Sequence, residues 1–241
     1  MFILWLLLIV VVIILCVVIF KYKRPRIDTL NGISGQVGGG KTSSCLCRVI
    51  SYLRRIYFLG RNKRRYKNDY IILSNFPIGK EEKKRGKKTG KRFIRIWFKK
   101  IYCYDLTLNV ILLQTRLPQD EVILIIDEFS GIVSQLDYNL PIVKDNIKEF
   151  ARCFRQYTHS KGLLFWVDQC AKEIVNPVRR RTAYCYNMLH CRKLPLLPIV
   201  IYEYRKILIS DEVENTIDTA TNTNEEDIKK FIFFSNPFKW Y

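Results

Sequence analysis

Residues 35–42 read Gly35-Gln36-Val37-Gly38-Gly39-Gly40-Lys41-Thr42, which is the G-x-x-x-x-G-K-T pattern of a phosphate-binding loop, or Walker A motif. The glycines allow successive backbone N–H groups to turn inward around the phosphates of a nucleotide. Lys41 adds a positive charge toward the β- and γ-phosphates, and the hydroxyl of Thr42 can bind Mg²⁺. We therefore expect Gly35 to Ser43 to bind ATP, with Lys41 also acting in catalysis. The alternative is an ordinary glycine turn.

Such a loop works only between a strand and a helix, and the flanking sequence fits both. The segment from Leu30 to Ser34 is short but can form the end of a strand. After the loop, apolar residues recur at helical spacing, namely Leu46, Val49, Ile50 and Leu53. We expect a helix whose N-terminus faces the phosphates.

An apolar run at residues 122–126 is followed directly by Asp127 and Glu128. An uninterrupted apolar run is typical of a central parallel strand that is buried on both faces. Ligands bind at the C-terminal ends of such strands. We expect Asp127, as the Walker B carboxylate, to hold Mg²⁺ together with Thr42, and Glu128 to orient and deprotonate the attacking water. The alternative is a strand that ends in an acidic turn.

Two more apolar runs, at residues 70–74 and 163–167, predict further strands of the same sheet. The second run ends at Asp168-Gln169. A polar residue at the tip of the strand beside the Asp127 strand can sense the γ-phosphate, and Gln169 is our candidate. The alternative for Gln169 is a helix cap.

A helical pattern that begins at Pro141, followed by closing strands at 183–190 and 198–208, completes the expected core. The pattern predicts an α/β fold with a mainly parallel sheet flanked by helices. In phosphoryl transfer, an arginine from a neighbouring subunit can stabilise charge in the transition state. We choose Arg180 for this role and expect the other arginines of this region to be surface or nucleic-acid contacts: Arg152, Arg155, Arg179 and Arg181.

Residues 1–20 contain no charged residue and consist almost entirely of large apolar residues. As a helix they would span about 30 Å, the thickness of the hydrocarbon core of a bilayer. They lack the basic start and the small residues of a cleaved signal peptide, so we expect a retained single-pass transmembrane anchor. The basic linker at 21–28 follows, and the positive-inside rule places the N-terminus outside and the rest of the chain in the cytoplasm.

The formal net charge of +19 favours an anionic partner, either nucleic acid or the lipid surface beside the anchor. The most basic segment is an insertion at 79–104, whose first half we expect to be a loop and whose second half we expect to form a hairpin. A short helix is expected at 106–114. Basic residues beside aromatic ones can bind single-stranded nucleic acid. The alternative is a solvated insertion whose aromatic residues pack on the core.

The remaining sequence features concern the cysteines and the limits of the domain. Eight cysteines without a C-x-x-C pair, and only two histidines, favour reduced thiols in the core over a zinc site. We expect the ATPase domain to occupy 29–210, with an acidic loop and an aromatic tail at 211–241. The aromatic residues of the tail should pack on the domain or on a partner.

Several of these segments together resemble one family, the zonular occludens toxin-like (Zot) proteins, which are related to the DNA-pumping FtsK and HerA motors. The resemblance is carried by GQVGGGKT, by Ile72 to Ile78 (ILSNFPI), by VILIIDEF, and by Arg155 to Gly162 (RQYTHSKG) leading to Trp166-Val167-Asp168-Gln169. It covers roughly residues 29–190. In this family the membrane span usually follows the ATPase domain, whereas here the apolar segment is N-terminal.

The resemblance implies an inner-membrane ATPase that drives assembly and extrusion of a single-stranded DNA phage. Its expected partners are single-stranded DNA or a nucleoprotein, phage coat proteins, and further copies of the chain in a homo-oligomeric ring. One alternative is a DNA translocase of the FtsK, HerA or conjugative type. Another is a membrane scaffold that binds nucleotide as a switch and binds coat protein instead of DNA. A nucleotide kinase would need neither an anchor nor a charge of +19.

Overall fold

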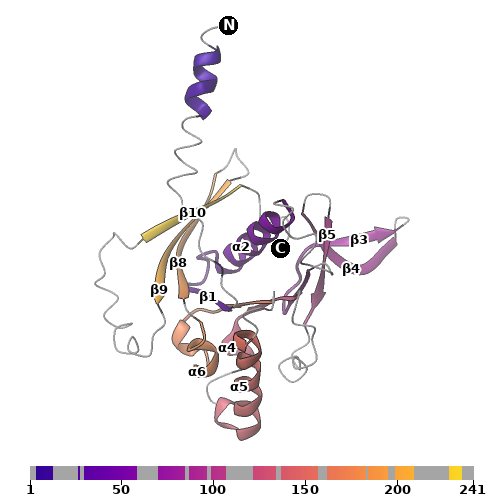
Figure 1. Cartoon of the computed structure of the whole chain (residues 1–241), viewed down its shortest axis with the longest axis vertical. Coiled ribbons are helices and arrows are strands. Elements are labelled where there is room, and N and C mark those ends of the chain that lie inside the picture. The colour runs from indigo at the N-terminus through magenta and orange to yellow at the C-terminus, as the bar shows by residue number, and fades with distance from the viewer. Residues whose placement is uncertain are drawn as a thin grey trace.

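The computed structural model describes most of the chain from Leu30 onward as strands and helices (Figure 1). The described residues are 4–12, 27, 30–58, 70–84, 87–96, 99–106, 122–133, 137–156, 162–182, 184–194, 199–208 and 228–234. Within these ranges the strands form one sheet in the order β10-β9-β8-β1-β7-β6-β2-β5-β4-β3. The fold is therefore of the mixed α/β class, as the sequence predicted.

The centre of the sheet is parallel. Its strands are β8 (Tyr184–Lys193), β1 (Leu30–Gly35), β7 (Leu163–Val167), β6 (Val122–Asp127), β2 (Ile71–Ser74) and β5 (Lys99–Asp105). Strands β7, β6 and β2 are those expected from the apolar runs, whereas β5 was expected only as part of a hairpin. Every residue of β1 and β7 is buried. Burial on both faces explains why β7 reads as a continuous apolar run instead of an alternating one. Strand β1 is equally buried, although its sequence LNGISG is not such a run.

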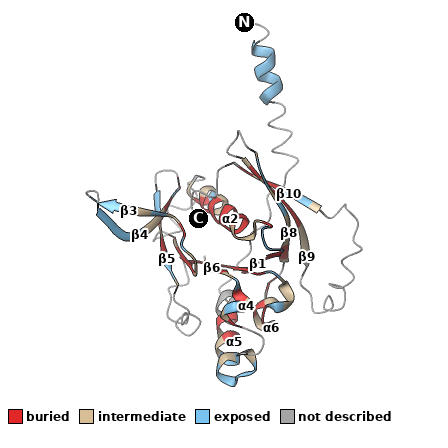
Figure 2. Ribbon diagram, turned by 180° about the vertical axis from the view of Figure 1, so that it is seen from behind, coloured by how far each residue is buried: buried red, intermediate tan, exposed pale blue. Residues whose placement is uncertain are grey.

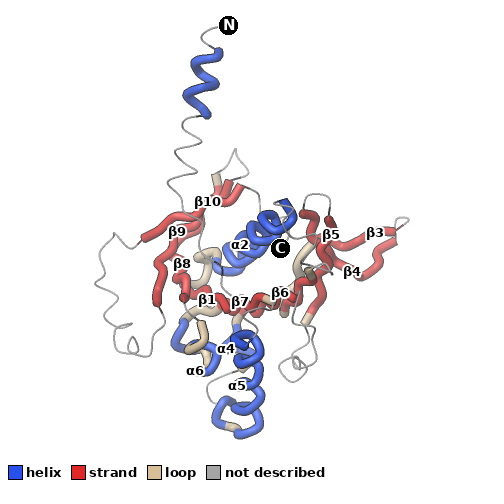
Figure 3. Tube along the Cα trace, in the orientation of Figure 1, coloured by secondary structure: helices blue, strands red, loops and turns tan. Residues whose placement is uncertain are grey.

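Helices cover both faces of this sheet. The sheet curves around α2 (Lys41–Phe58), while α4 (Phe129–Ile132), α5 (Pro141–Gln156) and α6 (Asn176–Arg179) cover the opposite face (Figure 3). Two 3-10 turns, η3 (Asp137–Asn139) and η4 (Ala171–Glu173), lie in the connections. Each face has its own buried apolar cluster, and full burial of one such aliphatic side chain contributes about 1.5–3 kcal/mol. Both faces of the parallel sheet that carries the C-terminal edge are thus packed against apolar side chains.

One charged side chain, Arg48 of α2, is buried in the cluster between α2 and the sheet. Its guanidinium carbon lies 3.9 Å from the ring centroid of Tyr186 and 5.5 Å from that of Tyr204. No hydrogen-bond partner for its nitrogen atoms exists among the described residues. Burial lowers the pKa of Arg48, and the two tyrosine rings act in the opposite direction. Attraction between the cation and the ring faces partly offsets the loss of water.

Both ends of the sheet are antiparallel. On one side, β8 pairs with β9 (Ile199–Leu208) and β9 pairs with β10 (Ile228–Phe234), where Phe231 and Phe233 are buried. The aromatic tail therefore packs on the domain at these two positions. Residues 211–227 and 235–241 lie outside the described residues.

On the other side, β5 pairs with β4 (Lys87–Ile96), and β4 pairs with β3 (Lys80–Lys84). The hairpin expected for the second half of the insertion is present. The loop expected for its first half is wrong, because these residues form a second hairpin. Strands β3 and β4 expose both faces near their connection, so no apolar alternation marked them as strands. The helix expected at 106–114 lies almost entirely outside the described residues.

The expected membrane anchor is described only at residues 4–12, which are helical. The large apolar side chains of this helix are exposed, from 45% for Val11 to 76% for Leu4. Considering only the parts of the chain that the structure describes, no helix is long and apolar enough to cross a membrane. The other residues of segment 1–20 are not among those parts.

Candidate nucleotide-binding site

The Walker A loop connects the end of β1 to the start of α2 at the C-terminal edge of the parallel strands. Gly35, Gly38 and Gly40 have φ values of 140°, 81° and 80°, which a residue with a side chain rarely adopts. Gln36, Val37 and Gly38 are exposed, whereas Gly39 is buried. The loop is therefore strained in the way that glycine tolerates, with its outer residues open to a ligand.

Strand β8 passes close behind this loop. A Cβ atom at Gly35 would lie 2.4 Å from the carbonyl oxygen of Met188, and one at Gly40 would lie 2.6 Å from the Cβ of Cys191. Ser43, which the sequence assigned to the nucleotide, is buried and donates to the carbonyl of Gly40 at 3.0 Å. These contacts fix the path of the loop from behind.

The side chain of Thr42 reaches the end of β6, whereas that of Lys41 stays over the loop. The hydroxyl of Thr42 donates to Asp127 Oδ2 at 2.7 Å. The ammonium of Lys41 folds over the loop and donates to the carbonyls of Gly35 at 2.7 Å and Gln36 at 3.3 Å. Phosphate oxygens carry negative charge and are stronger acceptors than these carbonyls. The sequence prediction that Thr42 and Asp127 meet is thus supported by the geometry.

A second residue holds the end of β6 in place, and sequence reasoning missed it. Asn75 follows β2, and its side-chain amide donates to the carbonyl of Asp127 at 2.6 Å. Its side-chain oxygen accepts from the backbone N–H of Asp127 at 2.8 Å. One side chain therefore binds both backbone groups of Asp127. This holds in place the backbone from which the carboxylate projects. The sequence signal was a polar residue after the strand beside β6, which we interpreted only as a turn.

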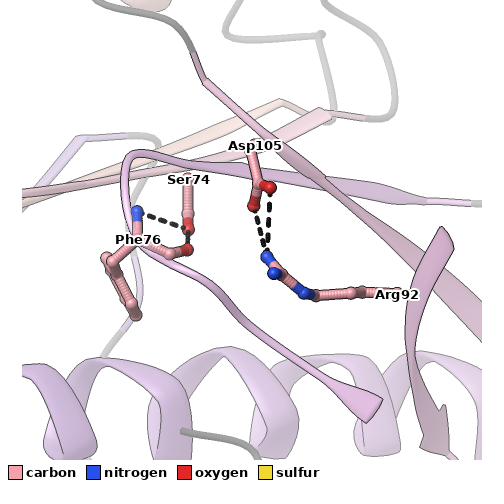
Figure 4. Close-up of polar contacts among 4 residues, drawn as sticks. All are labelled: Ser74, Phe76, Arg92 and Asp105. Carbon is pink, nitrogen blue, oxygen red and sulfur yellow. Dashed lines mark hydrogen bonds and ion pairs between the residues drawn. The ribbon is translucent and has the colours of Figure 1, made fainter. Parts of the chain in front are cut away.

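The turn that carries Asn75 is stabilised locally. The hydroxyl of Ser74 donates to the carbonyl of Phe76, and the Phe76 N–H lies 3.3 Å from the same hydroxyl (Figure 4). Ser74 also accepts from the N–H of Leu106 at 2.7 Å, at the end of β5. The turn therefore joins β5, which leads out of the basic insertion, to the end of β6.

Asp127 is partly buried, and Glu128 beside it has an unusual backbone. Burial raises the pKa of Asp127 above its ordinary value, and the hydrogen bond from Thr42 lowers it in part. Glu128 has φ 51° and ψ 55°, in the left-handed region, and its N–H donates to Asp127 Oδ1 at 3.2 Å. A residue with a side chain in this region costs of order 1–3 kcal/mol. Such strain is frequent at active sites, and the side chain of Glu128 is exposed.

The tip of β7 connects the loop with the segment after Glu128. Asp168 is buried, and its carboxylate accepts from the N–H and hydroxyl of Ser130 at 2.7 and 3.1 Å, and from the N–H of Gln169 at 2.7 Å. Gln169 has an exposed side chain, and its carbonyl accepts from the N–H of Gly35 at 3.1 Å. The structure therefore places Gln169 beside the loop, while Asp168, which the sequence reasoning passed over, makes the side-chain contacts.

Arg180 lies at the opposite edge of the sheet. It follows α6, and its N–H donates to the carbonyl of Asn176 at 2.9 Å. The chain then enters β8, where Cys185 is in register with Gly32 in a parallel pair. Arg180 therefore precedes the N-terminal ends of these strands, far from the loop at their C-terminal ends. Within one subunit it does not join the site, and its role toward a neighbouring subunit stays a prediction.

The chemistry of these groups fits ATP with Mg²⁺. Mg²⁺ prefers oxygen ligands and is commonly bound by one or two protein groups together with phosphates and water. The carboxylate of Asp127 and the hydroxyl of Thr42 supply such a pair, 2.7 Å apart. Among the described residues there is no cluster of three or more His, Cys, Asp or Glu side chains that could hold a metal ion.

A glycine loop between a strand and a helix, with a carboxylate at the end of a parallel strand, defines the P-loop class of nucleotide-binding proteins. No protein-family model and no curated protein matches this sequence. Among solved structures, the N-terminal domain of zonular occludens toxin from Neisseria meningitidis is similar, with a TM-score of 0.49 and 11% identity, over 90% of this chain and 100% of that domain. It carries the name of the family that the sequence motifs resemble.

A second similar structure is the genome packaging NTPase B204 from Sulfolobus turreted icosahedral virus 2. In its complex with ATP-gammaS it has a TM-score of 0.35 and 16% identity, over 71% of this chain and 78% of that chain. Its complex with sulfate has a TM-score of 0.36 over the same shares of both chains.

Proposed function

We propose that this chain is a membrane-anchored ATPase that drives the assembly and extrusion of a single-stranded DNA phage through the inner membrane of its host. The observation that carries the enzymatic part is the hydrogen bond between Thr42 and Asp127. It joins two motifs that are 85 residues apart into one site. The geometry of Asn75 and Asp168, which hold the surrounding backbone, supports the same assignment.

Each group of the site has a role in this proposal. The backbone N–H groups of residues 35–40 and the ammonium of Lys41 bind the phosphates, and Thr42 and Asp127 hold Mg²⁺. Bound Mg²⁺ supplies neutralisation of charge on the phosphates. Glu128 orients the attacking water, and its carboxylate takes the proton. Gln169 contacts the γ-phosphate, and Arg180 acts on the site of the next subunit in a homo-oligomeric ring.

The membrane and phage parts of the proposal rest on other features. The apolar segment 1–20 includes a described helix whose side chains are exposed, and the basic linker 21–28 follows it. A single span with the N-terminus outside places the ATPase domain in the cytoplasm, where ATP is found. The motif resemblance and the charge of +19 support DNA or a nucleoprotein as cargo and phage coat proteins as partners.

The enzymatic claim is tested with the full chain in neutral detergent. Lys41→Ala should abolish ATP binding and lower hydrolysis at least about 100-fold, because charge stabilisation of the phosphates is lost. Glu128→Gln should retain ATP binding and lower hydrolysis by about the same factor. Lys144→Ala, which alters an exposed lysine of α5, is the matched control and should leave both unchanged. Hydrolysis that survives in Lys41→Ala contradicts the claim.

The cellular claim is tested by supplying variants in trans to a phage that lacks this gene. Both Lys41→Ala and Glu128→Gln should stop virion release while intracellular phage DNA accumulates. Release supported by Glu128→Gln would show that binding suffices, as in a nucleotide-switched scaffold. Transfer of plasmid DNA in place of virion release would favour the conjugative alternative. Removal of residues 1–20 should move the protein from the membrane fraction to the soluble one.

A further inference from the structure

Strands β3 and β4 form a two-stranded ribbon at the end of the sheet, which we call the basic ribbon (residues 80–84 and 87–96). Figures 1 and 2 show it projecting from the body of the molecule. In its register Lys83 faces Lys88 and Lys84 faces Lys87. Side chains directly opposite each other in an antiparallel pair lie about 5 Å apart at their Cβ atoms, and like charges there are destabilising. Because neighbouring residues of a strand point to opposite faces, the end of the ribbon places one pair of lysines on each face.

The described carboxylates near the basic ribbon form a salt bridge with only one of these four lysines, Lys88. The only acidic residues between 80 and 105 are Glu81, Glu82 and Asp105. Glu81 pairs with Lys88 at 3.2 Å, and Glu82 pairs with Lys100 at 2.6 Å. Both carboxylate oxygens of Asp105 accept from Nη1 of Arg92, Oδ1 at 2.8 Å and Oδ2 at 3.0 Å (Figure 4). In the described part of the chain, no salt bridge is left for four exposed lysines: Lys83, Lys84, Lys87 and Lys91.

We propose that the basic ribbon binds the phosphate backbone of nucleic acid. A chain of phosphates between or along the facing lysines converts their mutual repulsion into attraction and releases counterions. This inference rests on the proposed function for its partner, because a motor that exports DNA needs a surface that holds it. It deepens that function by assigning the surface.

The composition of the basic ribbon distinguishes nucleic acid from a membrane surface. Segments that lie on a membrane carry aromatic or aliphatic residues that insert between the lipids. Around its exposed end the basic ribbon has no such residue: the described positions are Lys83, Lys84, Lys87, Lys88, Thr89, Gly90 and Lys91. All of them are exposed, as the pale blue colour of this end in Figure 2 shows. Because side chains alternate along a strand, these residues occupy both faces of the ribbon. A flat lipid surface meets one face only, whereas a nucleic-acid chain can follow both, and a major groove accepts a two-stranded ribbon.

The contact is with phosphates and not with bases. Phe93 is the aromatic residue that the structure describes in β4, and it is partly buried, with Lys100 Nζ 4.9 Å from its ring centroid. It is therefore already engaged and does not offer a free stacking face. Trp97 and Phe98 lie outside the described residues. Binding through phosphates alone is independent of sequence and depends steeply on salt.

The test compares two double variants of the full chain in neutral detergent. Lys83→Glu/Lys84→Glu reverses two charges of the basic ribbon without replacing Glu81 or Lys88. Lys144→Glu/Lys229→Glu makes the same change in net charge at exposed lysines of α5 and β10. Affinity is measured by fluorescence anisotropy with a mixed-sequence single-stranded oligonucleotide, its duplex, and fluorescent phosphatidylserine in micelles of the same detergent.

We expect the basic-ribbon variant to bind DNA at least about tenfold more weakly at about 50 mM salt than the parent chain. Its plot of log affinity against log salt should be shallower by about 1.4, the slope of two single-strand phosphate contacts. The control variant should keep both values within about twofold of the parent chain. Equal losses in the two variants, or no DNA binding by the parent chain, overturn the proposal. So does a basic-ribbon variant that loses only binding to the phosphatidylserine micelles, which would indicate a lipid partner.

The ATPase rate without DNA separates this inference from the proposed function. The basic-ribbon variant should hydrolyse ATP at the parent rate in the absence of DNA, because its lysines lie outside the nucleotide site. A parent chain that binds DNA through the basic ribbon but does not hydrolyse ATP would contradict the proposed function alone. A parent chain that hydrolyses ATP but binds DNA equally well without these lysines would contradict this inference alone.

Discussion

The C-terminal edge of the parallel strands and the basic ribbon belong to one sheet, but their charged groups have opposite surroundings. At the edge, Asp127 is bound by Thr42 and Asn75, and Asp168 is bound by Ser130 and Gln169. In the basic ribbon, lysine faces lysine. Groups that satisfy one another build a fixed site, whereas groups that repel one another stay available to an outside partner. The two aspartates therefore stabilise the structure of the site, whereas the lysines of the basic ribbon are exposed to a binding partner.

The largest effect on the satisfied region should come from Asp168→Ala. Three donors lose a buried carboxylate at once, so we expect a loss of about 3 kcal/mol in the free energy of unfolding. Chemical denaturation measures it. Asp145→Ala, at an aspartate of α5 whose side chain is 78% exposed, should change stability by less than about 0.5 kcal/mol. A loss below about 1 kcal/mol in Asp168→Ala would mean that these bonds do not hold the site together.

Asn75→Ala comes next, with an expected loss of about 2 kcal/mol, because the N–H and carbonyl of Asp127 lose their partner. Displacement of the carboxylate should also lower kcat for ATP at least about tenfold. Steady-state kinetics and denaturation give both values. Asn139→Ala, at an exposed position, is the control. An unchanged kcat would show that Asp127 needs no support from β2.

Asp127→Asn should have a smaller effect, and of opposite sign, on the protein without nucleotide. Burial raises the pKa of Asp127 in the folded state, so the folded state binds the proton more tightly than the unfolded state. Stability therefore falls as pH rises from the unfolded to the folded pKa, and the full cost is present above both. Removing the charge should raise Tm at pH 7 by about 2 °C, since partial exposure screens it. The difference should vanish as pH falls below about 3.9, and a Tm difference that is independent of pH would contradict this cause.

The smallest effect belongs to the basic ribbon. Lys84→Glu places a carboxylate opposite Lys87 and should stabilise the chain by about 0.5 kcal/mol at low salt. High salt should remove the gain, because the pair is exposed. Thermal denaturation at two salt concentrations measures it. A variant that is less stable at low salt would show that the lysines do not repel one another, and would contradict the contrast between the two regions of the sheet.

The centre of the fold was predictable because its signals are local. The glycine loop at 35–42 and the continuous apolar runs of β6 and β7 each identify an element by themselves. Asn75 and Asp168 were missed because their partners are 52 and 38 residues away and no pattern joins them. The β3–β4 hairpin was missed for another reason. Near their connection these strands pair only with each other, and without a buried face there they carry no apolar alternation.

The close passage of β8 behind the Walker A loop has a consequence for protein engineering. Gly35 and Gly40 have no room for a side chain because Met188 and Cys191 occupy the space, and these residues come about 150 positions later in the chain. The eight residues of the loop are therefore not sufficient by themselves to reproduce its conformation in another protein. A designer who grafts these eight residues into another sheet must also transplant the strand behind them, or choose a host whose neighbouring strand leaves the same clearance.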